Sequence, residues 1–357
     1  MKSTANKILN GVSLFSSAGI GEAFFKDIGV KIVVANELLE DRAKLYSKLY
    51  SDTKMIAGDI LDKKVFKSIL EHAGNNVDFL IATPPCQGMS MAGKNRDQKT
   101  MLNDQRNHLV FKIIDFINIK KPKYILIENV PNFLKLKLPF KNKLLTLEEI
   151  LSSLYSKDYE IEARVMDTSE YGVPQKRNRA IIKMHKKGLH WAWPTKEKSK
   201  TVKEAIGHLP SLEANQKSKL SWHFARKHAE NHILWMKNTP TGKSAFENKK
   251  HYPKKDNGET IKSYMTTYRR IKWDEPSPTI TMRNDAISSQ LNVHPGRRLK
   301  DGTYSDARVL TPLELMILSS LPEKWNVPQD TPEILIRKCL GESVPPLLLK
   351  KVLSGIK

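Results

Sequence analysis

The sequence has little cysteine, no long apolar segment and fewer acidic than basic side chains. Only 2 of its 357 residues are cysteines, which excludes a disulfide framework and favours a reducing, intracellular compartment. No run of about 18 apolar residues occurs, so no membrane-spanning helix is expected. The first residues also lack the apolar stretch of a signal peptide. These absences together predict a cytoplasmic protein.

The charge balance points to a polyanionic partner. Lysine and arginine number 60 against 38 aspartates and glutamates, which leaves a net charge of +22. Such an excess favours nucleic acid first. Most of the excess is lysine, so a biased genome composition is the alternative explanation. Hydrophobic residues make up 39% of the chain, which is enough to bury a core in one large domain plus a smaller one.

Apolar and amphipathic segments alternate along the first half of the chain. The apolar segments are rich in Ile, Val, Leu and Phe without clear alternation, as expected for strands buried on both faces. The expected strands are Ile8–Phe15, Lys31–Glu37, Lys54–Ile60, Val77–Thr83, Lys123–Glu128, Ile161–Val165 and Arg179–Met184. Helices are expected at Gln105–Lys121, Leu144–Leu154 and Pro345–Ile356. This alternation predicts an α/β fold with a parallel, doubly wound sheet.

The composition changes near Met184. All 6 tryptophans lie beyond that residue, in a stretch rich in Lys, His and Pro with weak periodicity. We therefore predict one domain made of residues 1–185 and 330–357, and a smaller, mixed domain of residues 186–329. Most tryptophans of the smaller domain are expected in its core, because tryptophan is usually highly buried.

A glycine-containing turn, Phe15–Gly21, follows the first expected strand. Such a turn lets a ligand approach the backbone and the N-terminus of the next helix. Glu37 ends the second strand at the spacing from Gly19 where a carboxylate can bind ribose hydroxyls. Asp59 ends the third strand, where it could accept a hydrogen bond from an adenine amino group. Ordinary turn glycines and strand-end acids are the alternative interpretation.

Cys86 follows two prolines at the carboxyl end of the fourth expected strand. Ligands of open α/β sheets bind at this edge, and prolines fix the backbone that presents the thiol. A thiol of ordinary pKa is only about 3% ionised at pH 7, so a nucleophilic Cys86 needs assistance from its site. A buried structural cysteine is the alternative, and for Cys339 it is the interpretation we favour.

Glu128 follows the apolar part of the fifth expected strand, at the same sheet edge as Cys86. Partial burial would raise its pKa and keep a proton available, which suits a general acid. A structural strand-end acid is the alternative for Glu128 taken alone. Its place beside Cys86 in the expected sheet order favours the catalytic interpretation.

These features occur in an order that resembles the DNA (cytosine-5)-methyltransferase family over nearly the whole chain. The matching blocks are Phe15–Gly21, Glu37, Asp59, Pro85–Gln87, Asp104–Leu109, Glu128–Val130, Gln175–Arg179, Pro276–Thr281, Arg308–Glu314 and Gly341–Pro345. Two positions depart from the family. Ser17 stands where the first glycine of the turn is usual, and Glu342 stands where asparagine is usual.

The resemblance implies a Rossmann-like, S-adenosylmethionine-dependent methyltransferase with a smaller DNA target-recognition domain. Cys86 would attack carbon 6 of a flipped-out cytosine, and Glu128 would protonate or hydrogen-bond ring nitrogen 3. Arg179, together with Arg177, would hold the base. Carbon 5 would then take the methyl group, and loss of a proton would expel the thiol.

The same resemblance implies which residues surround the cofactor. They are Phe15, Ala18, Gly19, Glu37, Leu38, Asp59, Ile60, Pro85, Leu109, Ser343 and Val344. Candidate DNA-binding residues come from the polar stretch 87–103 and from the smaller domain, and they are Gln87, Ser90, Lys94, Arg96, Arg269 and Arg270. Lysine supplies phosphate affinity and arginine can read guanine edges, whereas a merely solvated charge is the alternative for the loop residues.

Other function classes account for fewer of these residues. A dehydrogenase could share the turn and Glu37 but would need neither Cys86 nor Glu128. An amino-group methyltransferase typically has an aromatic residue after its Pro-Pro. An RNA substrate and a non-catalytic DNA-binding protein stay open, although the long stretch before Pro276 favours a dedicated DNA-reading domain. We expect a stand-alone, monomeric, metal-free enzyme that acts on double-stranded DNA and protects it from a restriction endonuclease.

Overall fold

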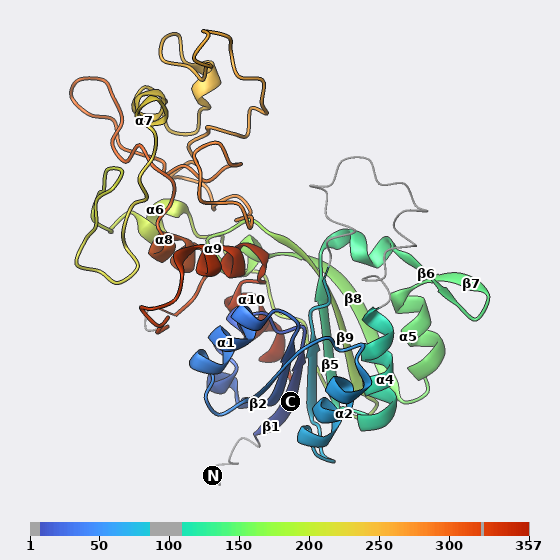
Figure 1. Ribbon diagram of the computed structural model, residues 1–357. Helices are drawn as coiled ribbons and strands as arrows, with labels where there is room; N and C mark the ends of the chain where they lie inside the picture. The colour runs from blue at the N-terminus through green and yellow to red at the C-terminus, as the bar shows by residue number, and fades with distance from the viewer. Residues whose placement is uncertain (1–7, 86–108, 323–324, 357) are drawn as a thin grey trace. The chain divides into compact units, whose positions relative to one another are not determined.

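The computed structural model describes residues 8–85, 109–322 and 325–356, in two compact units (Figure 1). Unit 1 comprises Met1–Asp167, Asn178–Pro194 and Leu349–Lys357, and unit 2 comprises Thr168–Arg177 and Thr195–Leu348. By packing, residues 330–348 therefore group with unit 2. The catalytic and target-recognition domains proposed from sequence, with limits at 185/186 and 329/330, stay a prediction. No helix among the described residues is long and apolar enough to cross a membrane.

A seven-stranded sheet forms the centre of unit 1, in the order β3-β2-β1-β4-β5-β9-β8. Its strands are β1 (Leu9–Leu14), β2 (Val30–Glu37), β3 (Lys54–Ala57), β4 (Phe79–Ala82), β5 (Tyr124–Asn129), β8 (Tyr159–Asp167) and β9 (Asn178–Lys186). All seven predicted strands are confirmed. The strand order reverses between β1 and β4, which is where ligands bind in doubly wound sheets.

The predicted parallel, doubly wound sheet is confirmed for five strands, and one edge of the sheet differs in direction. Strands β1 to β5 are parallel, but β9 is antiparallel to both β5 and β8. Only residues 168–177 separate β8 from β9 along the chain, and a parallel connection needs a longer crossover, usually through a helix. The edge strand β8 is largely solvent-accessible, whereas β4 and β5 are buried throughout.

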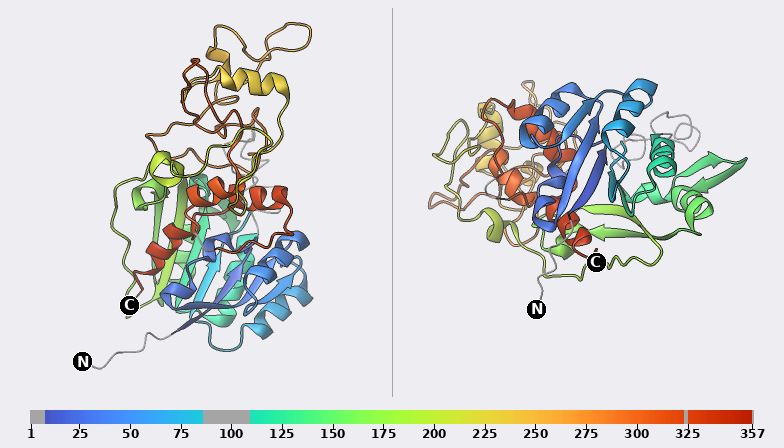
Figure 2. Two further views of the ribbon diagram at one scale, coloured as in Figure 1. Left: turned by 90° about the vertical axis from the view of Figure 1, so that its left-hand side faces the viewer. Right: turned by 90° about the horizontal axis from the view of Figure 1, so that it is seen from below.

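Helices pack against one face of the sheet through a continuous apolar cluster. They are α2 (Lys63–His72), α4 (Val110–Lys120) and α5 (Leu147–Tyr155), while α1 (Glu40–Leu49) follows β2. Val12 and Leu80 of the sheet belong to the same cluster as Ile69, Ile113 and Ile150 of these helices. On the opposite face, the rings of Phe79 and Tyr124 contact those of Phe25 and Trp191. Both faces are thus covered, as two further views show (Figure 2).

A small hairpin precedes α5 and corrects one predicted helix boundary. Strands β6 (Lys137–Phe140) and β7 (Lys143–Thr146) pair antiparallel outside the main sheet. Residues 144–146, predicted as the start of a helix, therefore belong to β7. The helix begins after them because Thr146 caps it, accepting from the Glu149 N–H while the Glu149 carboxylate accepts from the Thr146 N–H.

Unit 2 contains few regular elements. Its helices are α6 (Val202–Ile206), α7 (Glu230–Lys237), α8 (Pro312–Leu318) and α9 (Glu333–Glu342), and α10 (Pro346–Leu353) crosses the boundary between the units. Short 3₁₀ turns complete both units: η1 (Ile20–Glu22), η2 (Lys26–Ile28), η4 (Pro131–Lys135), η5 (Thr168–Tyr171) and η6 (Ala245–Glu247). Trp222 and Trp235 are buried, which confirms that they are core residues.

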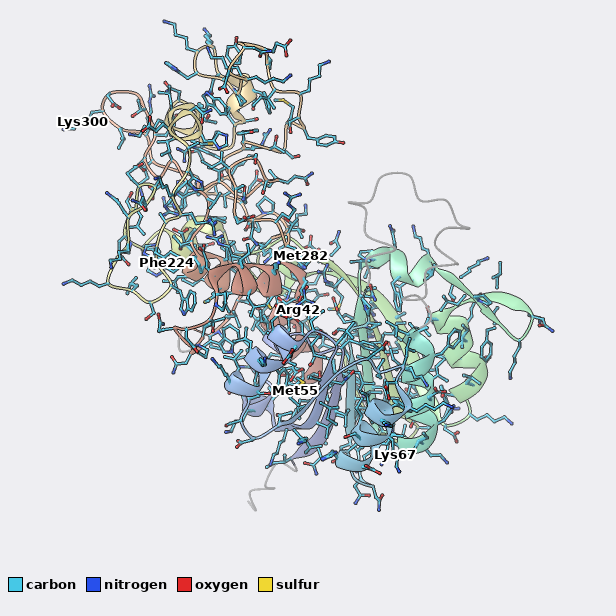
Figure 3. The ribbon with its side chains drawn as sticks, viewed as in Figure 1. Arg42, Met55, Lys67, Phe224, Met282 and Lys300 are labelled. Carbon is cyan, nitrogen blue, oxygen red and sulfur yellow. The ribbon has the colours of Figure 1, made fainter. Side chains whose placement is uncertain are left out.

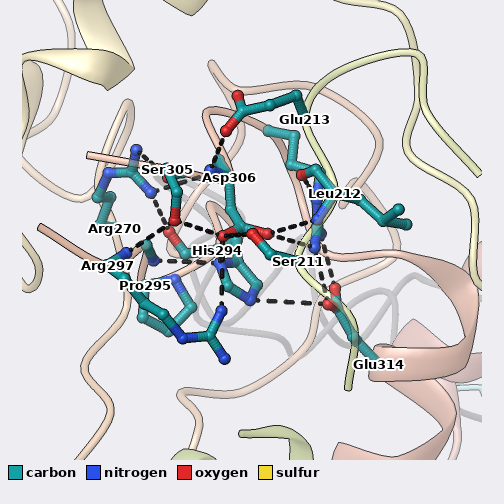
Figure 4. A network of polar contacts seen from close by, with 12 residues as sticks. Ser211, Leu212, Glu213, Arg270, His294, Pro295, Arg297, Ser305, Asp306 and Glu314 are labelled. Carbon is teal, nitrogen blue, oxygen red and sulfur yellow. Dashed lines mark hydrogen bonds and ion pairs between the residues drawn. The ribbon is translucent and has the colours of Figure 1, made fainter. Parts of the chain in front are cut away.

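Buried charges hold the loops of unit 2 together (Figure 4). The guanidinium of Arg308 is fully buried and donates to both carboxylate oxygens of Glu314, at 2.8 and 2.9 Å, and to Asp306 at 3.1 Å. Burial acts against ionisation of Glu314, but the charges and hydrogen bonds of Arg308, His294 and His223 together outweigh it and hold the pKa of that carboxyl well below its usual value. Glu314 also accepts from the N–H of Thr311, the cap of α8. The block Arg308–Glu314 thus contains both the cap of α8 and a buried ion pair.

Removal of Arg308 should destabilise the protein strongly. We expect Arg308→Met to lower the free energy of unfolding by about 3–5 kcal/mol, because Glu314 and Asp306 would stay buried without compensation. Urea unfolding followed by fluorescence measures the loss. The exposed Arg298 provides the matched control, and Arg298→Met should change stability by less than about 0.5 kcal/mol. A loss below about 1 kcal/mol for Arg308→Met would contradict this account.

Candidate active site

In the turn after β1, every second residue has a left-handed backbone conformation. Phe15, Ser17 and Gly19 have φ values of 61°, 48° and 72°. L residues other than glycine rarely adopt this region. Ser17 therefore holds a conformation that favours glycine, at the position where the family usually has one. Its N–H donates to Glu37 Oε2 at 2.8 Å, which supports the unfavourable backbone.

Gly19 occupies a place that only glycine fits. A Cβ atom at this position would lie 2.5 Å from the ring of Tyr50 and 2.7 Å from the ring of Tyr46, both on or next to α1. The hydroxyl of Tyr50 donates to the Gly19 carbonyl at 2.6 Å. The tyrosines at i and i+4 of this helix thus support the turn from below, and the prediction that Gly19 shapes it agrees with this packing.

Glu22 is a buried carboxyl group beneath the turn that sequence reasoning missed. Its two oxygens accept from Ser13 Oγ and from the hydroxyl of Tyr46, each at 2.6 Å. Burial raises the pKa of Glu22 to about 7, although the two hydrogen bonds oppose the shift. Nothing in the local sequence distinguishes this acid from one on a helix surface. Only the packing of Tyr46 over it reveals that it is enclosed.

The two acids predicted to face a nucleoside lie at the same sheet edge. Glu37 ends β2 and is buried, and its carboxylate accepts from the N–H groups of Ser17 and Leu39. Asp59 is exposed and lies two residues beyond the end of β3, where it accepts from the N–H of Leu61 at 2.9 Å. Each carboxylate has lone pairs for more acceptor bonds than these. Both can therefore still bind hydroxyl or amino groups.

Exposed leucines accompany these acids. Leu38 and Leu61 are 62% and 45% exposed, and each directly follows or nearly follows a strand-end acid. Exposed apolar side chains of this size offer contact area to a flat ligand. Of the other predicted cofactor residues in unit 1, Ala18 and Ile60 are buried, and Phe15, Pro85 and Leu109 are partly buried.

Glu128 and Arg179 form a buried ion pair between β5 and β9. Arg179 Nε lies 2.7 Å from Glu128 Oε1, and only 9% of each side chain is exposed. The antiparallel register brings them together, since Asn129 pairs with Ala180. The guanidinium stabilises the ionised carboxylate, which opposes the effect of burial that the sequence prediction relied on.

The segment before Cys86 is attached to this same strand end. Asn129 Nδ2 donates to the carbonyl of Pro84 at 3.0 Å, and Thr83 Oγ1 donates to the carbonyl of Phe15 at 2.8 Å. The two prolines therefore start from a point fixed by β5 and by the first turn. Cys86 itself lies outside the described residues, as do Gln87, Ser90, Lys94 and Arg96.

In unit 2, Arg177 joins three of the sequence blocks. Its buried guanidinium donates to the carbonyls of Ile280, at 2.5 Å, and Gly341, at 2.8 Å. A Cβ atom on Gly341 would lie 2.3 Å from the carbonyl oxygen of Thr281, so glycine permits this close approach. Arg177 thus positions these blocks, and its predicted contact with the base stays a prediction. Ser343, which ends α9, is half-buried and Val344 is buried.

The two arginines predicted to touch DNA in the smaller domain have different surroundings. Arg270 is fully buried, and its guanidinium donates to the backbone carbonyls of Met236, His294, Asp306 and Ser305. A direct contact between Arg270 and DNA is incompatible with this position, and its role is structural. Arg269 is partly exposed and donates to the Gly242 carbonyl, so its DNA contact stays a prediction.

Two further predictions concern side chains with other chemistry. Cys339 is fully buried in α9, which confirms its structural interpretation. Among the residues that the structure describes, no group of three or more His, Cys, Asp and Glu side chains could hold a metal ion.

Known proteins resemble the chain over its whole length. Residues 9–357 match the family described as C-5 cytosine-specific DNA methylase. The Type II methyltransferase M1.HgaI of Avibacterium volantium is 57% identical over 98% of each chain, and M1.HphI of Haemophilus parahaemolyticus is 27% identical over 98% of this chain and 86% of that protein. A prophage-encoded protein of E. coli, described as a DNA modification methyltransferase, shares the fold with a TM-score of 0.70 at 20% identity, over 97% of this chain and 98% of its own.

The buried Glu22 should make stability depend on pH. Its pKa is raised from 4.5 to about 7 in the folded protein, so folding favours the protonated group and stability falls as pH rises through about 7. The shift corresponds to at most about 3 kcal/mol. Glu22→Gln mimics the protonated form. We therefore expect the variant to gain stability relative to the parent protein between about pH 5 and pH 8 in urea unfolding.

The exposed Glu71 on α2 supplies the matched control. For Glu71→Gln, the difference in stability from the parent protein should stay constant over the same pH range. A constant difference for Glu22→Gln as well would show that Glu22 does not titrate in this range.

Proposed function

Because the chain belongs to the C-5 cytosine-specific DNA methylase family, we propose that it methylates carbon 5 of a flipped-out cytosine through a covalent Cys86 adduct, with S-adenosylmethionine as donor. The family makes the chain a DNA cytosine-5 methyltransferase. The donor, the extruded base and the thiol adduct are the proposal. The observation that carries it is the buried Glu128–Arg179 pair at the strand end to which Pro84 is anchored.

The proposed chemistry divides a difficult alkylation into easier steps. The Cys86 thiolate adds to carbon 6, and the displaced electron pair is neutralised by a proton delivered from Glu128 to ring nitrogen 3. The enamine carbon 5 would then bond to the methyl group as the carbon–sulfur bond of the donor breaks and its electrons stay on sulfur, and ring nitrogen 3 would return its proton to Glu128. Loss of the proton from carbon 5 returns the electrons and expels the thiolate. Arg179 holds the Glu128 carboxyl in one position during these steps, so the acid is already oriented toward ring nitrogen 3.

Protonation of Glu128 has to accompany base binding. The pair with Arg179 favours the carboxylate, whereas exclusion of water by a bound base favours the neutral acid. A base whose ring nitrogen 3 accepts a hydrogen bond from the acid adds to the second effect. Base binding and protonation of Glu128 therefore favour one another.

The first turn and the ends of β2 and β3 fit the proposed donor. Glu37 would accept from the ribose hydroxyls and Asp59 from the adenine amino group. Leu38 and Leu61 would pack against the adenine ring. When bound there, S-adenosylmethionine supplies an electrophilic methyl group. Because Gly19 has no side chain, the turn packs closely on Tyr46 and Tyr50, which holds its backbone in place beside the proposed donor.

The proposed substrate is a specific sequence in double-stranded DNA. A net charge of +22 suits a polyanion, and the base must leave the duplex before a side chain can reach carbon 6. The chain is similar over its full length to Type II methyltransferases. We therefore propose that it acts in the cytoplasm as a monomer, within a restriction-modification system, and that its methylation protects DNA from a restriction endonuclease.

Trapping of a covalent complex tests the nucleophile. Duplex DNA that carries 5-fluorocytosine at the target should form a denaturant-resistant complex, because fluorine at carbon 5 cannot leave as a proton does. Bisulfite sequencing of DNA from expressing cells first identifies the target. Cys86→Ala should form no complex, whereas Cys339→Ala, at the buried cysteine, should still be trapped. A covalent complex with Cys86→Ala would refute the assignment.

Turnover and cofactor binding of a Glu128 variant test the acid. Glu128→Gln should lower kcat by about 10²- to 10⁴-fold, the usual contribution of general acid catalysis. Calorimetry should give an affinity for S-adenosylmethionine within about twofold of the parent protein. The exposed Glu160 on β8 is the control, and Glu160→Gln should keep full turnover. Unchanged turnover in Glu128→Gln would end the assignment.

A further inference from the structure

The β6–β7 hairpin carries a local concentration of positive charge. Between residues 131 and 147 the sequence contains four lysines and no acidic residue. Lys135, Lys137, Lys141 and Lys143 are all exposed. None of the four forms a salt bridge in the part of the chain that the structure describes, although Lys137 interacts electrostatically with Glu149 at longer range. The acid at the start of α5, Glu149, is engaged by the N–H of Thr146.

The hairpin is a rigid support for these charges. Its connection, Lys141 and Asn142, has φ values of 47° and 62°, as in the two-residue turns that match strand twist. Its inner side is part of the main core. Leu138 is 1% exposed, and the ring of Phe140 stacks on that of Phe111 with centroids 6.5 Å apart. The lysines are therefore presented on a backbone that loses little conformational freedom when they bind a ligand.

The hairpin follows closely in the chain after the carboxyl end of β5, where the proposed catalytic residue Glu128 lies. After Glu128 and Asn129, the 3₁₀ turn η4 leads into β6. Val130 donates its N–H to Asn129 Oδ1, and Phe133, 2% exposed, donates its N–H to the Val130 carbonyl. A short, packed connection thus joins the hairpin to the edge where the flipped base would lie. In Figure 1 it projects from unit 1 beside α5.

We propose that the β6–β7 hairpin binds the DNA backbone next to the target cytosine, through Lys137, Lys141 and Lys143 on phosphates. This inference rests on the proposed function, since it requires a DNA substrate at the carboxyl end of β5. Lysine is a compact, flexible point charge that favours phosphate over base edges. The hairpin therefore contributes affinity and holds the duplex in register, and it does not read sequence.

Salt dependence of DNA binding tests the proposal. Each phosphate contact adds about 0.9 to the slope of log Kd against log salt. The variant Lys137→Gln/Lys141→Gln/Lys143→Gln should lower this slope by about 2–3. We also expect it to weaken binding of a labelled duplex with the target site by about tenfold or more at about 0.15 M salt. Its turnover at saturating DNA should stay within about twofold, because none of these residues contacts the reacting base.

A second triple variant with the same charge change serves as control. Lys63→Gln/Lys64→Gln/Lys67→Gln alters three exposed lysines of α2 (Lys67 is labelled in Figure 3). It should change the slope by less than about 0.5 and the affinity by less than about twofold. Equal slopes for the parent and the hairpin variant would overturn the proposal, as would equal losses in the two triple variants. If the hairpin triple variant folds poorly, Lys141→Gln/Lys143→Gln at the turn should still lower the slope by about 1–2.

The readouts separate this proposal from the proposed function. A parent protein that binds the duplex with a hairpin-dependent slope but forms no adduct with 5-fluorocytosine would retain the hairpin contact and reject the covalent mechanism. A trapped adduct together with a salt slope that does not depend on the hairpin would support the covalent mechanism and reject the hairpin contact.

Discussion

Buried guanidinium groups determine how the irregular parts of this protein are held. A charge removed from water is costly unless it is paired or hydrogen-bonded, so each buried arginine fixes the segments whose acceptors surround it. Arg308 joins Asp306 and Glu314 to the loop at Leu212. Arg337 of α9 donates to Glu333 of its own helix and to the carbonyls of Asn284 and Leu310. Unit 2 has few helices, and these bonds replace much of what regular structure would supply.

At the candidate active site, a buried arginine also fixes its neighbours, but here it orients a proposed catalytic carboxyl group. Arg179 is paired with one carboxylate, that of Glu128, and the pair lies at the carboxyl end of β5, the end of a parallel strand at which open α/β sheets bind ligands. Arg177, two residues earlier, donates to backbone carbonyls and so acts on the geometry of unit 2. Two neighbouring arginines of one sequence block thus have different roles, and their hydrogen-bond partners distinguish these roles.

The sequence predicted the strands well, because buried strands have a recognisable apolar composition. It predicted strand direction and side-chain burial poorly where these depend on contacts with residues distant in the sequence. The strands β4 and β5 are apolar throughout and were recognisable, as were Glu37 and Glu128 at strand ends. The direction of β9 was not recognisable, because the composition of a buried strand is the same in either direction. Glu22 escaped notice because its enclosure depends on Tyr46, a residue of α1. Similarly, an arginine pair such as Arg269 and Arg270 gives no sign of which member is buried.

These differences change how the net charge of the chain should be interpreted. Among the described residues, five arginines but only one lysine, Lys183, are buried. Lys183 is the exception because Glu162 lies 2.8 Å away and the ring of Trp193 covers its ammonium group. Arginine can satisfy several carbonyls at once from a planar group, whereas the ammonium of lysine is strongly hydrated and favours the surface. These five arginines are therefore held inside the fold by carboxylates and backbone carbonyls. The charge that DNA can reach is carried mainly by lysine, on surfaces such as the β6–β7 hairpin.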